Sequence, residues 1–140
     1  MQVTRIDQIA VVVHDLDEAL AEYKELFGMV PVSREFIDDA GLDEAMIDIG
    51  GVYLQLIAPT RPDSVVARFL EQRGPGLHHI GFAVNSVGGA LDDLRAKGAP
   101  LIDQVARTGG GGHEIAFVHP LAVSKVLVEL VGEASPADSR

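Results

Sequence analysis

The stretch LHHIGFAV, residues 77–84, decides the fold, because a second copy of its pattern lies near the N-terminus as IDQIAVVV, residues 6–13. At a shift of 71 positions, His79 against Gln8, the two copies place a metal-capable side chain at the third position of an apolar strand. Both segments are rich in β-branched and apolar residues, which is typical of buried strands. The sequence therefore predicts a duplicated fold.

The duplication continues towards the C-terminal end of each half. VYLQL, residues 52–56, resembles VLVEL, residues 126–130, at a shift of 74 positions, Glu129 against Gln55. Loops between strands and helices absorb a difference of three residues without disturbing the elements they join. Two half-domains of the same build are expected.

The elements expected in each half follow from hydrophobic periodicity and from turn residues. In the first module, over about 5–58, they are a strand at 6–13, a helix ending at Gly28, and strands at 29–36, 44–49 and 52–57. A connector over 59–76 holds a further helix. In the second module, over about 77–131, they are a strand at 77–84, a helix at 87–97, and strands at 100–105, 114–118 and 125–131. The fold class is α+β: two β-α-β-β-β modules in one domain over 1–140, forming an open barrel with one cleft, with a flexible tail at 132–140.

Composition narrows the function. The 140 residues include no cysteine, which excludes thiol catalysis and zinc ribbons and is compatible with a reducing cytoplasm. The N-terminus has no signal-peptide pattern, and no apolar run approaches a membrane span of about 20 residues, so a soluble cytoplasmic protein is expected. A net charge of −10 argues against nucleic acid or an anionic membrane as partner. Partly apolar helices and strand edges favour a homodimer.

Four polar residues at matching sites of the repeat form the candidate metal site: Gln8, Gln55, His79 and Glu129. Gln55 and Glu129 each stand between apolar neighbours in a strand, so their side chains point away from those neighbours. An imidazole nitrogen, a carboxylate and two amide oxygens suit Co, Mn, Ni or Zn. The alternative is that all four are hydrogen-bonded polar residues of the core.

The chain resembles the methylmalonyl-CoA epimerases of the vicinal oxygen chelate superfamily over roughly residues 5–131. The segments that carry the resemblance are IDQI at 6–9, YLQLIAP at 53–59, DS at 63–64, GLHHI at 76–80, FVHP at 117–120 and VLVEL at 126–130. It implies a divalent metal, cobalt preferred, held by Gln8, Gln55, His79 and Glu129. Gln8 departs from the family, which usually carries His there. A neutral amide oxygen is a poorer donor to such an ion, so weaker metal binding is expected.

The resemblance also implies the chemistry, which is epimerisation of methylmalonyl-CoA or a similar 2-substituted malonyl thioester. A cation that stabilises the enolate oxygen makes the α-proton removable, and inversion needs two groups on opposite faces. The resemblance assigns these roles to Glu129 and Glu44. It also aligns the loop of Gly110, Gly111, Gly112 and His113 with a segment that approaches the acyl carboxylate. Four successive glycines are equally typical of a flexible linker.

Three positions differ from similar epimerases: Glu114 stands where a basic residue is common, Leu121 where Lys is usual, and Lys125 where Gly is frequent. Loss of positive charge weakens the case for a CoA phosphate tail, so another carrier stays open.

Two other functions remain. One is a different chelate chemistry on the same metal, as in a glyoxalase, a lyase or a tailoring paralogue. The other is a metal-free protein that sequesters small molecules, for which this chain, with 5% aromatic residues and no Trp, is poorly equipped.

Overall fold

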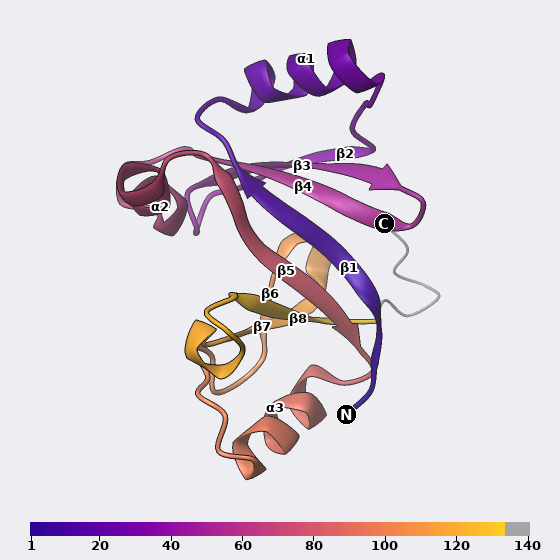
Figure 1. The fold of residues 1–140 in the computed structure, drawn as a ribbon, viewed down its shortest axis with the longest axis vertical. Helices are drawn as coiled ribbons and strands as arrows, with labels where there is room; N and C mark the ends of the chain where they lie inside the picture. The colour runs from indigo at the N-terminus through magenta and orange to yellow at the C-terminus, as the bar shows by residue number, and fades with distance from the viewer. Residues whose placement is uncertain (134–140) are drawn as a thin grey trace. The chain divides into compact units, whose positions relative to one another are not determined.

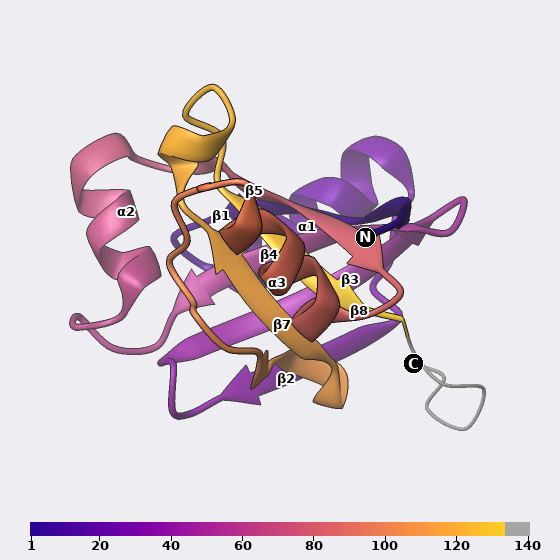
Figure 2. The same cartoon turned by 90° about the horizontal axis from the view of Figure 1, so that it is seen from below.

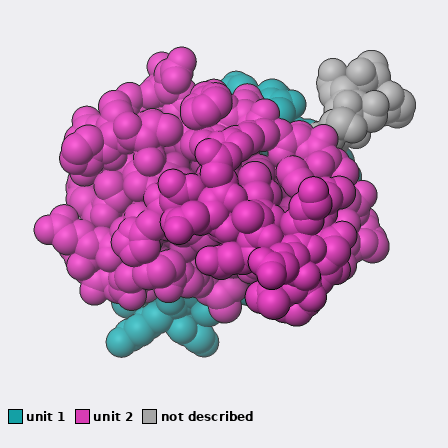
Figure 3. Space-filling view, turned by 90° about the horizontal axis from the view of Figure 1, so that it is seen from above, with its two compact units in different colours: residues 1–7, 79–140 teal, residues 8–78 magenta. Residues whose placement is uncertain are grey.

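The computed structural model describes residues 1–133 and divides into two compact units, each described here by itself (Figure 3). One unit comprises residues 8–78. The other combines residues 1–7 with the chain from His79 onward. The boundaries cut through the two copies of the repeated strand, at Asp7–Gln8 and at His78–His79. The predicted tail at 134–140 lies outside the described residues.

The unit of residues 8–78 contains the first predicted module and the connecting helix. Its elements are β1 (Val3–Val12, from Gln8 on), α1 (Leu16–Phe27), β2 (Ser33–Ile37), β3 (Leu42–Ile49), β4 (Val52–Pro59) and α2 (Val65–Arg73). Strand β4 pairs parallel with β1 and antiparallel with β3, and β3 pairs antiparallel with β2. Helix α1 lies alongside β2, β3 and β4 (Figure 1).

The other unit repeats this pattern. Its elements are β5 (Gly76–Val84, from His79 on), α3 (Val87–Ala96), β6 (Arg107–Thr108), β7 (Glu114–Val118) and β8 (Val128–Gly132), with short 3-10 turns at Gly110–Gly112 and Pro120–Ala122. Strand β8 pairs parallel with β5 and antiparallel with β7, and β7 pairs antiparallel with β6. Figure 2 shows α3 against β7. The predicted pair of β-α-β-β-β modules is confirmed.

Strand register reproduces the repeat residue by residue. Gln55 lies opposite Ala10 on β1, and Glu129 lies opposite Gly81 on β5. Ala10 and Gly81 are related by the shift that relates Gln8 to His79, so Gln55 and Glu129 occupy equivalent places in the two sheets. The three-residue drift in sequence is therefore taken up outside the paired strands.

Each sheet buries one face under a helix. Helix α1 packs through Leu16 and Ala19 on Ala45, Ile47, Leu56 and Ala58. Helix α3 packs through Val87, Ala90 and Leu91 on Ala116, Val118, Val128 and Leu130. Because strand side chains alternate between faces, Gln8, Gln55, His79 and Glu129 lie on the faces that these two helices do not cover.

Side chains cap the start of each of the three helices. Asp15, Ser64 and Ser86 cap α1, α2 and α3, each accepting a hydrogen bond from the backbone N–H three residues on. Gly28 ends α1 with φ of 68°, in the left-handed region that glycine adopts without strain. Among the described residues, no helix is long and apolar enough to cross a membrane.

The predicted strands at 29–36, 100–105 and 125–131 differ most from the structure. The strand expected at 29–36 is Ser33–Ile37, because the backbone N–H of Met29 bonds back to Tyr23 in α1. The strand expected at 100–105 is absent: Leu101 makes only an isolated bridge to Val118, and β6 is the pair Arg107–Thr108. The strand expected at 125–131 is Val128–Gly132, because Ser124 and Lys125 have positive φ and cannot extend. Gly132, predicted as tail, is the last residue of that strand.

The position of Gly109, at the start of the glycine loop, has no room for a larger side chain. A Cβ at this position would lie 2.7 Å from Cδ1 and 3.0 Å from both Cγ atoms of buried Ile115, so no single rotation relieves the clash. We expect Gly109→Ala to lower the free energy of unfolding by about 1–3 kcal/mol, the usual cost of overpacking. Gly88→Ala, at an exposed position of helix α3 with open space around the added carbon, is the control and should raise the free energy of unfolding by about 0.5–1 kcal/mol. Denaturant titration of both variants measures the difference, and equal effects would contradict the packing argument.

Candidate active site

Three of the predicted site residues share one face of the sheet in the unit of residues 8–78. Gln8 stands on β1 two residues before Ala10, which lies opposite Gln55, and Glu44 stands on β3 two residues before Met46, which also lies opposite Gln55. Side chains two apart on a strand point to the same face. All three are buried: Gln8 is 2% exposed, Glu44 5% and Gln55 8%.

Of the two polar atoms of the Gln55 amide, the nitrogen makes a hydrogen bond and the oxygen makes none among the described residues. Its Nε2 donates a hydrogen bond of 2.5 Å to Oε2 of Glu44. This orientation is chemically required, because a carboxylate accepts hydrogen bonds and the amide oxygen does not donate. It leaves Oε1 of Gln55 buried with no hydrogen-bond partner among the described residues. A buried amide oxygen without a partner costs free energy, so this atom is suited to a ligand that the protein binds.

On the opposite face of β3, Asp43 fixes the strand that holds Glu44. Arg34 on β2 donates to Asp43 from Nε at 3.2 Å and Nη2 at 2.8 Å, and from Nη1 to Asp17 of α1 at 2.6 Å. These hydrogen bonds raise the pKa of Arg34 above its ordinary value. The guanidinium thereby links β2, β3 and α1 behind the strand that carries Glu44.

The other unit brings together the remaining two predicted ligands. His79 Nε2 lies 3.3 Å from Oε2 of Glu129, and both side chains are buried. His79 stands on β5 two residues before Gly81, which lies opposite Glu129 on β8. An imidazole nitrogen and a carboxylate oxygen are both donors that divalent ions such as Zn²⁺ bind.

Phe117 is a site residue that the sequence argument missed. Phe117 is on β7, directly opposite Glu129 on β8. Its ring meets the His79 ring edge-on, with centroids 5.3 Å apart and planes at 89°. The pattern FVHP was read only as part of the family resemblance. Its alternation places Phe117 on the Glu129 face, but the identity of the cross-strand neighbour depends on register, which the sequence does not give.

The glycine loop before β7 is closed by backbone hydrogen bonds. Gly109 N–H donates to the His113 carbonyl at 2.8 Å, and Gly112 N–H donates to the Gly109 carbonyl at 3.2 Å. Gly111 and Gly112 have φ of 69° and 76°, which favour glycine. The His113 ring is buried, with Nδ1 3.3 Å from the Gly132 carbonyl of β8. These bonds favour an ordered loop over a flexible linker.

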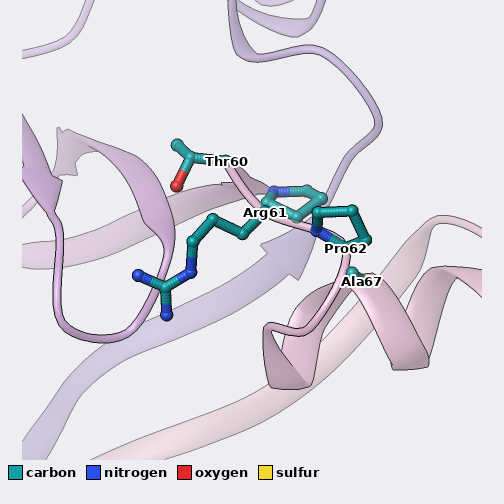
Figure 4. A pocket seen from close by; sticks show the side chains of 5 residues that line it. Thr60, Arg61, Pro62 and Ala67 are labelled. Atoms are coloured by element: carbon teal, nitrogen blue, oxygen red, sulfur yellow. The ribbon is translucent and has the colours of Figure 1, made fainter.

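A shallow pocket in the unit of residues 8–78 contains none of the predicted site residues. It is lined by Pro59, Thr60, Arg61, Pro62 and Ala67, where β4 leads into α2 (Figure 4). The guanidinium of Arg61 donates to the carbonyls of Asp38 at 2.5 Å and Asp39 at 3.1 Å. Arg61 therefore holds the turn between β2 and β3, and we assign the pocket no ligand.

The donor set fits a metal ion only if amide oxygens take part. Among residues 1–133, no three His, Asp or Glu side chains are grouped as a metal site would need. In the unit that contains His79, the imidazole of His79 and the carboxylate of Glu129 are donors of a suitable kind. In the unit of residues 8–78, the Oε1 atom of Gln55 is a donor of a suitable kind.

The three departures in charge all lie on the surface. Glu114, Leu121 and Lys125 are exposed, with Leu121 at 70%. Their side chains are therefore available to a large ligand and are not part of the buried site.

Comparison with known proteins identifies the family. The family model of the glyoxalase/bleomycin resistance protein/dioxygenase superfamily matches residues 7–117. Bovine mitochondrial methylmalonyl-CoA epimerase is 31% identical over 127 residues, which cover 90% of this chain and 73% of that protein.

Solved structures agree. A variant of Streptomyces coelicolor methylmalonyl-CoA epimerase in complex with 2-nitronate-propionyl-CoA superposes with a TM-score of 0.91 and 38% identity, over 96% of this chain and 97% of that one. A methylmalonyl-CoA epimerase in complex with methylmalonyl-CoA and NH4+ gives a TM-score of 0.90 with the same identity and coverage. This chain therefore belongs to the glyoxalase/bleomycin resistance protein/dioxygenase superfamily and, within it, to the methylmalonyl-CoA epimerases.

Proposed function

We propose that this chain epimerises methylmalonyl-CoA, or a similar 2-substituted malonyl thioester, by removing and returning the α-proton. The observation that carries the proposal is the pair of buried carboxylates, Glu44 beside Gln55 and Glu129 beside His79. The activity and ligands of the similar epimerases support the choice of substrate. A carboxylate is the group that takes or gives a proton in such a step when it is held in place and shielded from water.

We further propose that Gln8, Gln55, His79 and Glu129 bind one divalent cation, with cobalt preferred and Mn, Ni or Zn as alternatives. The vacant Oε1 of Gln55 supports this, because a cation satisfies a buried acceptor that the protein leaves without a donor. When bound, the cation supplies the positive charge that stabilises an enolate oxygen.

The proton transfers are assigned to the chain's own carboxylates. Glu129 takes the α-proton, the C–H electron pair becomes the C=C bond of the enolate, and the carbonyl pair moves to oxygen. Glu44, protonated, returns a proton to the opposite face and so inverts the carbon. The hydrogen bond from Gln55 holds Oε2 of Glu44 and leaves its other oxygen for the proton. The reverse reaction exchanges the two roles.

We also propose that the loop of Gly110, Gly111, Gly112 and His113 borders the acyl group. Its ordered turn presents backbone rather than side chains, which suits close approach of a carboxylate. The buried His113 ring anchors the loop to β8.

The test measures deuterium uptake at the α-carbon of methylmalonyl-CoA in D2O, using protein treated with a chelator and then supplied with Co²⁺. We expect uptake to fall by at least about tenfold after chelation and to return with Co²⁺, since the enolate would otherwise lack its counter-charge. Equal uptake in both samples would contradict the metal requirement. Metal binding without deuterium uptake would discard this substrate in favour of another chelate chemistry. A protein that shows neither metal binding nor deuterium uptake would favour the function of a binding protein.

A further inference from the structure

Three residues of the unit that contains His79 form a closed set of contacts around one aromatic ring. Nε of Arg107 lies 3.3 Å from Oδ1 of Asp103, and the Arg107 guanidinium lies over the Phe117 ring, 5.5 Å from its centroid. Oδ2 of the same Asp103 accepts a hydrogen bond of 2.7 Å from the backbone N–H of Phe117. Each member therefore contacts the other two, which restricts the motion of all three.

The backbone of Phe117 is held from both sides. Its carbonyl accepts hydrogen bonds from the N–H groups of Ile102 and Asp103, each at 3.1 Å, while its own N–H is bound by the Asp103 carboxylate. Its cross-strand neighbour Glu129, on β8, lies on the other edge of β7. The Cα of Phe117 is thus fixed between β8 and the segment 102–103, and Arg107 fixes the ring.

The ring so fixed touches the candidate ligands. Phe117 is the cross-strand neighbour of Glu129, and its ring meets the His79 imidazole in a T-shaped contact at 5.3 Å. Such aromatic contacts have a preferred geometry, so they orient both rings as well as burying them. The His79 ring therefore lies in contact with both the Glu129 carboxylate and the Phe117 ring.

The other unit has no equivalent of this arrangement at its own ligand. Met46 occupies the place of Phe117, opposite Gln55, and a methionine side chain is flexible and packs without a fixed orientation. Gln55 is oriented instead by its hydrogen bond to Glu44. The two halves of the repeat thus hold their candidate ligands by different means, a hydrogen bond in one and an aromatic ring in the other.

We propose that Phe117, held by Asp103 and Arg107, is the positioning residue for the His79 imidazole. It acts through His79 and does not itself touch the reacting atoms. The consequence for cation binding rests on the proposed function, whereas the positioning of the ring does not. Groups that orient a ligating histidine typically change metal affinity by about 10–100-fold when they are lost.

Two variants test the proposal, with one control. Phe117→Leu removes the ring, and Arg107→Gln removes the cation above the ring at an exposed position. Lys97→Gln is the control: Lys97 is an exposed cation of the same unit, at the C-terminal cap of α3. Thermal unfolding of each variant shows whether the fold is retained.

The first readout needs no metal. Long-range ¹H–¹⁵N NMR of the histidine rings in cation-free protein, with the His79 signals assigned by their loss in His79→Gln, reports the environment and mobility of the imidazole. We expect the His79 signals to shift and broaden in Phe117→Leu and in Arg107→Gln and to stay unchanged in Lys97→Gln. Unchanged His79 signals in both test variants would overturn the proposal.

The second readout is Co²⁺ affinity by calorimetry. We expect the dissociation constant to rise about 10–100-fold in Phe117→Leu, to rise less in Arg107→Gln, and to stay constant in Lys97→Gln. Wild-type affinity in both test variants, with wild-type protein binding Co²⁺ and exchanging substrate, would overturn the proposal and leave the proposed function intact. Altered His79 signals in a protein that binds no Co²⁺ would support the positioning role and contradict the proposed metal site.

Discussion

Glu129→Gln is expected to reduce deuterium uptake by about 10³-fold or more into the enantiomer of methylmalonyl-CoA whose α-proton faces Glu129. Proton transfer by a positioned group contributes about 10²–10⁴-fold, and this substitution also removes the carboxylate that lies 3.3 Å from Nε2 of His79. The amide keeps the shape of the side chain, so the packing of β8 should be retained. Loss of the negative charge should also weaken Co²⁺ binding, because an amide oxygen is a poorer ligand than a carboxylate.

The control for this variant is Glu114→Gln, an exposed carboxylate on the neighbouring strand β7. It removes the same charge from the same unit without touching His79, and it should leave both uptake and Co²⁺ affinity within about twofold of wild type. Near-wild-type uptake in Glu129→Gln would contradict its role as a base. Near-wild-type Co²⁺ affinity would contradict its role as a ligand.

Glu44→Gln is expected to reduce the rate of inversion at the α-carbon by about 10³-fold and to leave Co²⁺ bound, because Glu44 is assigned to proton transfer alone. The two enantiomers of the substrate separate the roles. The enantiomer whose α-proton faces Glu129 should still exchange that proton with D2O and keep its configuration, whereas its mirror image should be inert. Chiral analysis of the recovered thioester, combined with mass spectrometry, measures inversion and exchange in one sample.

Glu35→Gln is the matched control for Glu44. Glu35 lies directly opposite Glu44 in the β2–β3 pair but is exposed, so it tests the loss of a carboxylate from the same pair of strands. It should invert the substrate as wild type does. Inversion by Glu44→Gln at the wild-type rate would show that another group returns the proton, and loss of Co²⁺ binding in Glu44→Gln would show that the carboxylate acts through Gln55.

Much of the fold follows from short-range pattern. The β-branched run at 6–13 and its copy at 77–84 predict the strands at which the repeat begins, and the turn at Gly50 and Gly51 predicts the hairpin between β3 and β4. Predictions failed where a segment has no periodicity of its own. The segment at 100–105 looks extended, yet its N–H groups are used to hold the backbone of Phe117 instead of forming a strand.

Those residues of the candidate site that occupy matching positions of the sequence repeat could be predicted from the sequence. Gln8 and His79 match by sequence alone, and so do Gln55 and Glu129. Glu44 has no such match, because the register places Ile115 at the equivalent position on β7, so only the family resemblance pointed to it. Phe117 was missed because an aromatic residue in a strand is ordinary core by sequence, and its partner is decided by strand register.

The sequence by itself determined the duplication, the order of the elements and the chemical types of the site residues, because strand alternation and turn residues act over a few positions of the chain. Tertiary structure alone decided which side chains meet. Gln55 donates to Glu44 across β3 and β4, and His79 meets Glu129 and Phe117 across β5, β8 and β7. Those contacts depend on register and on which face each helix covers, and both are set by the packing of residues far apart in the chain.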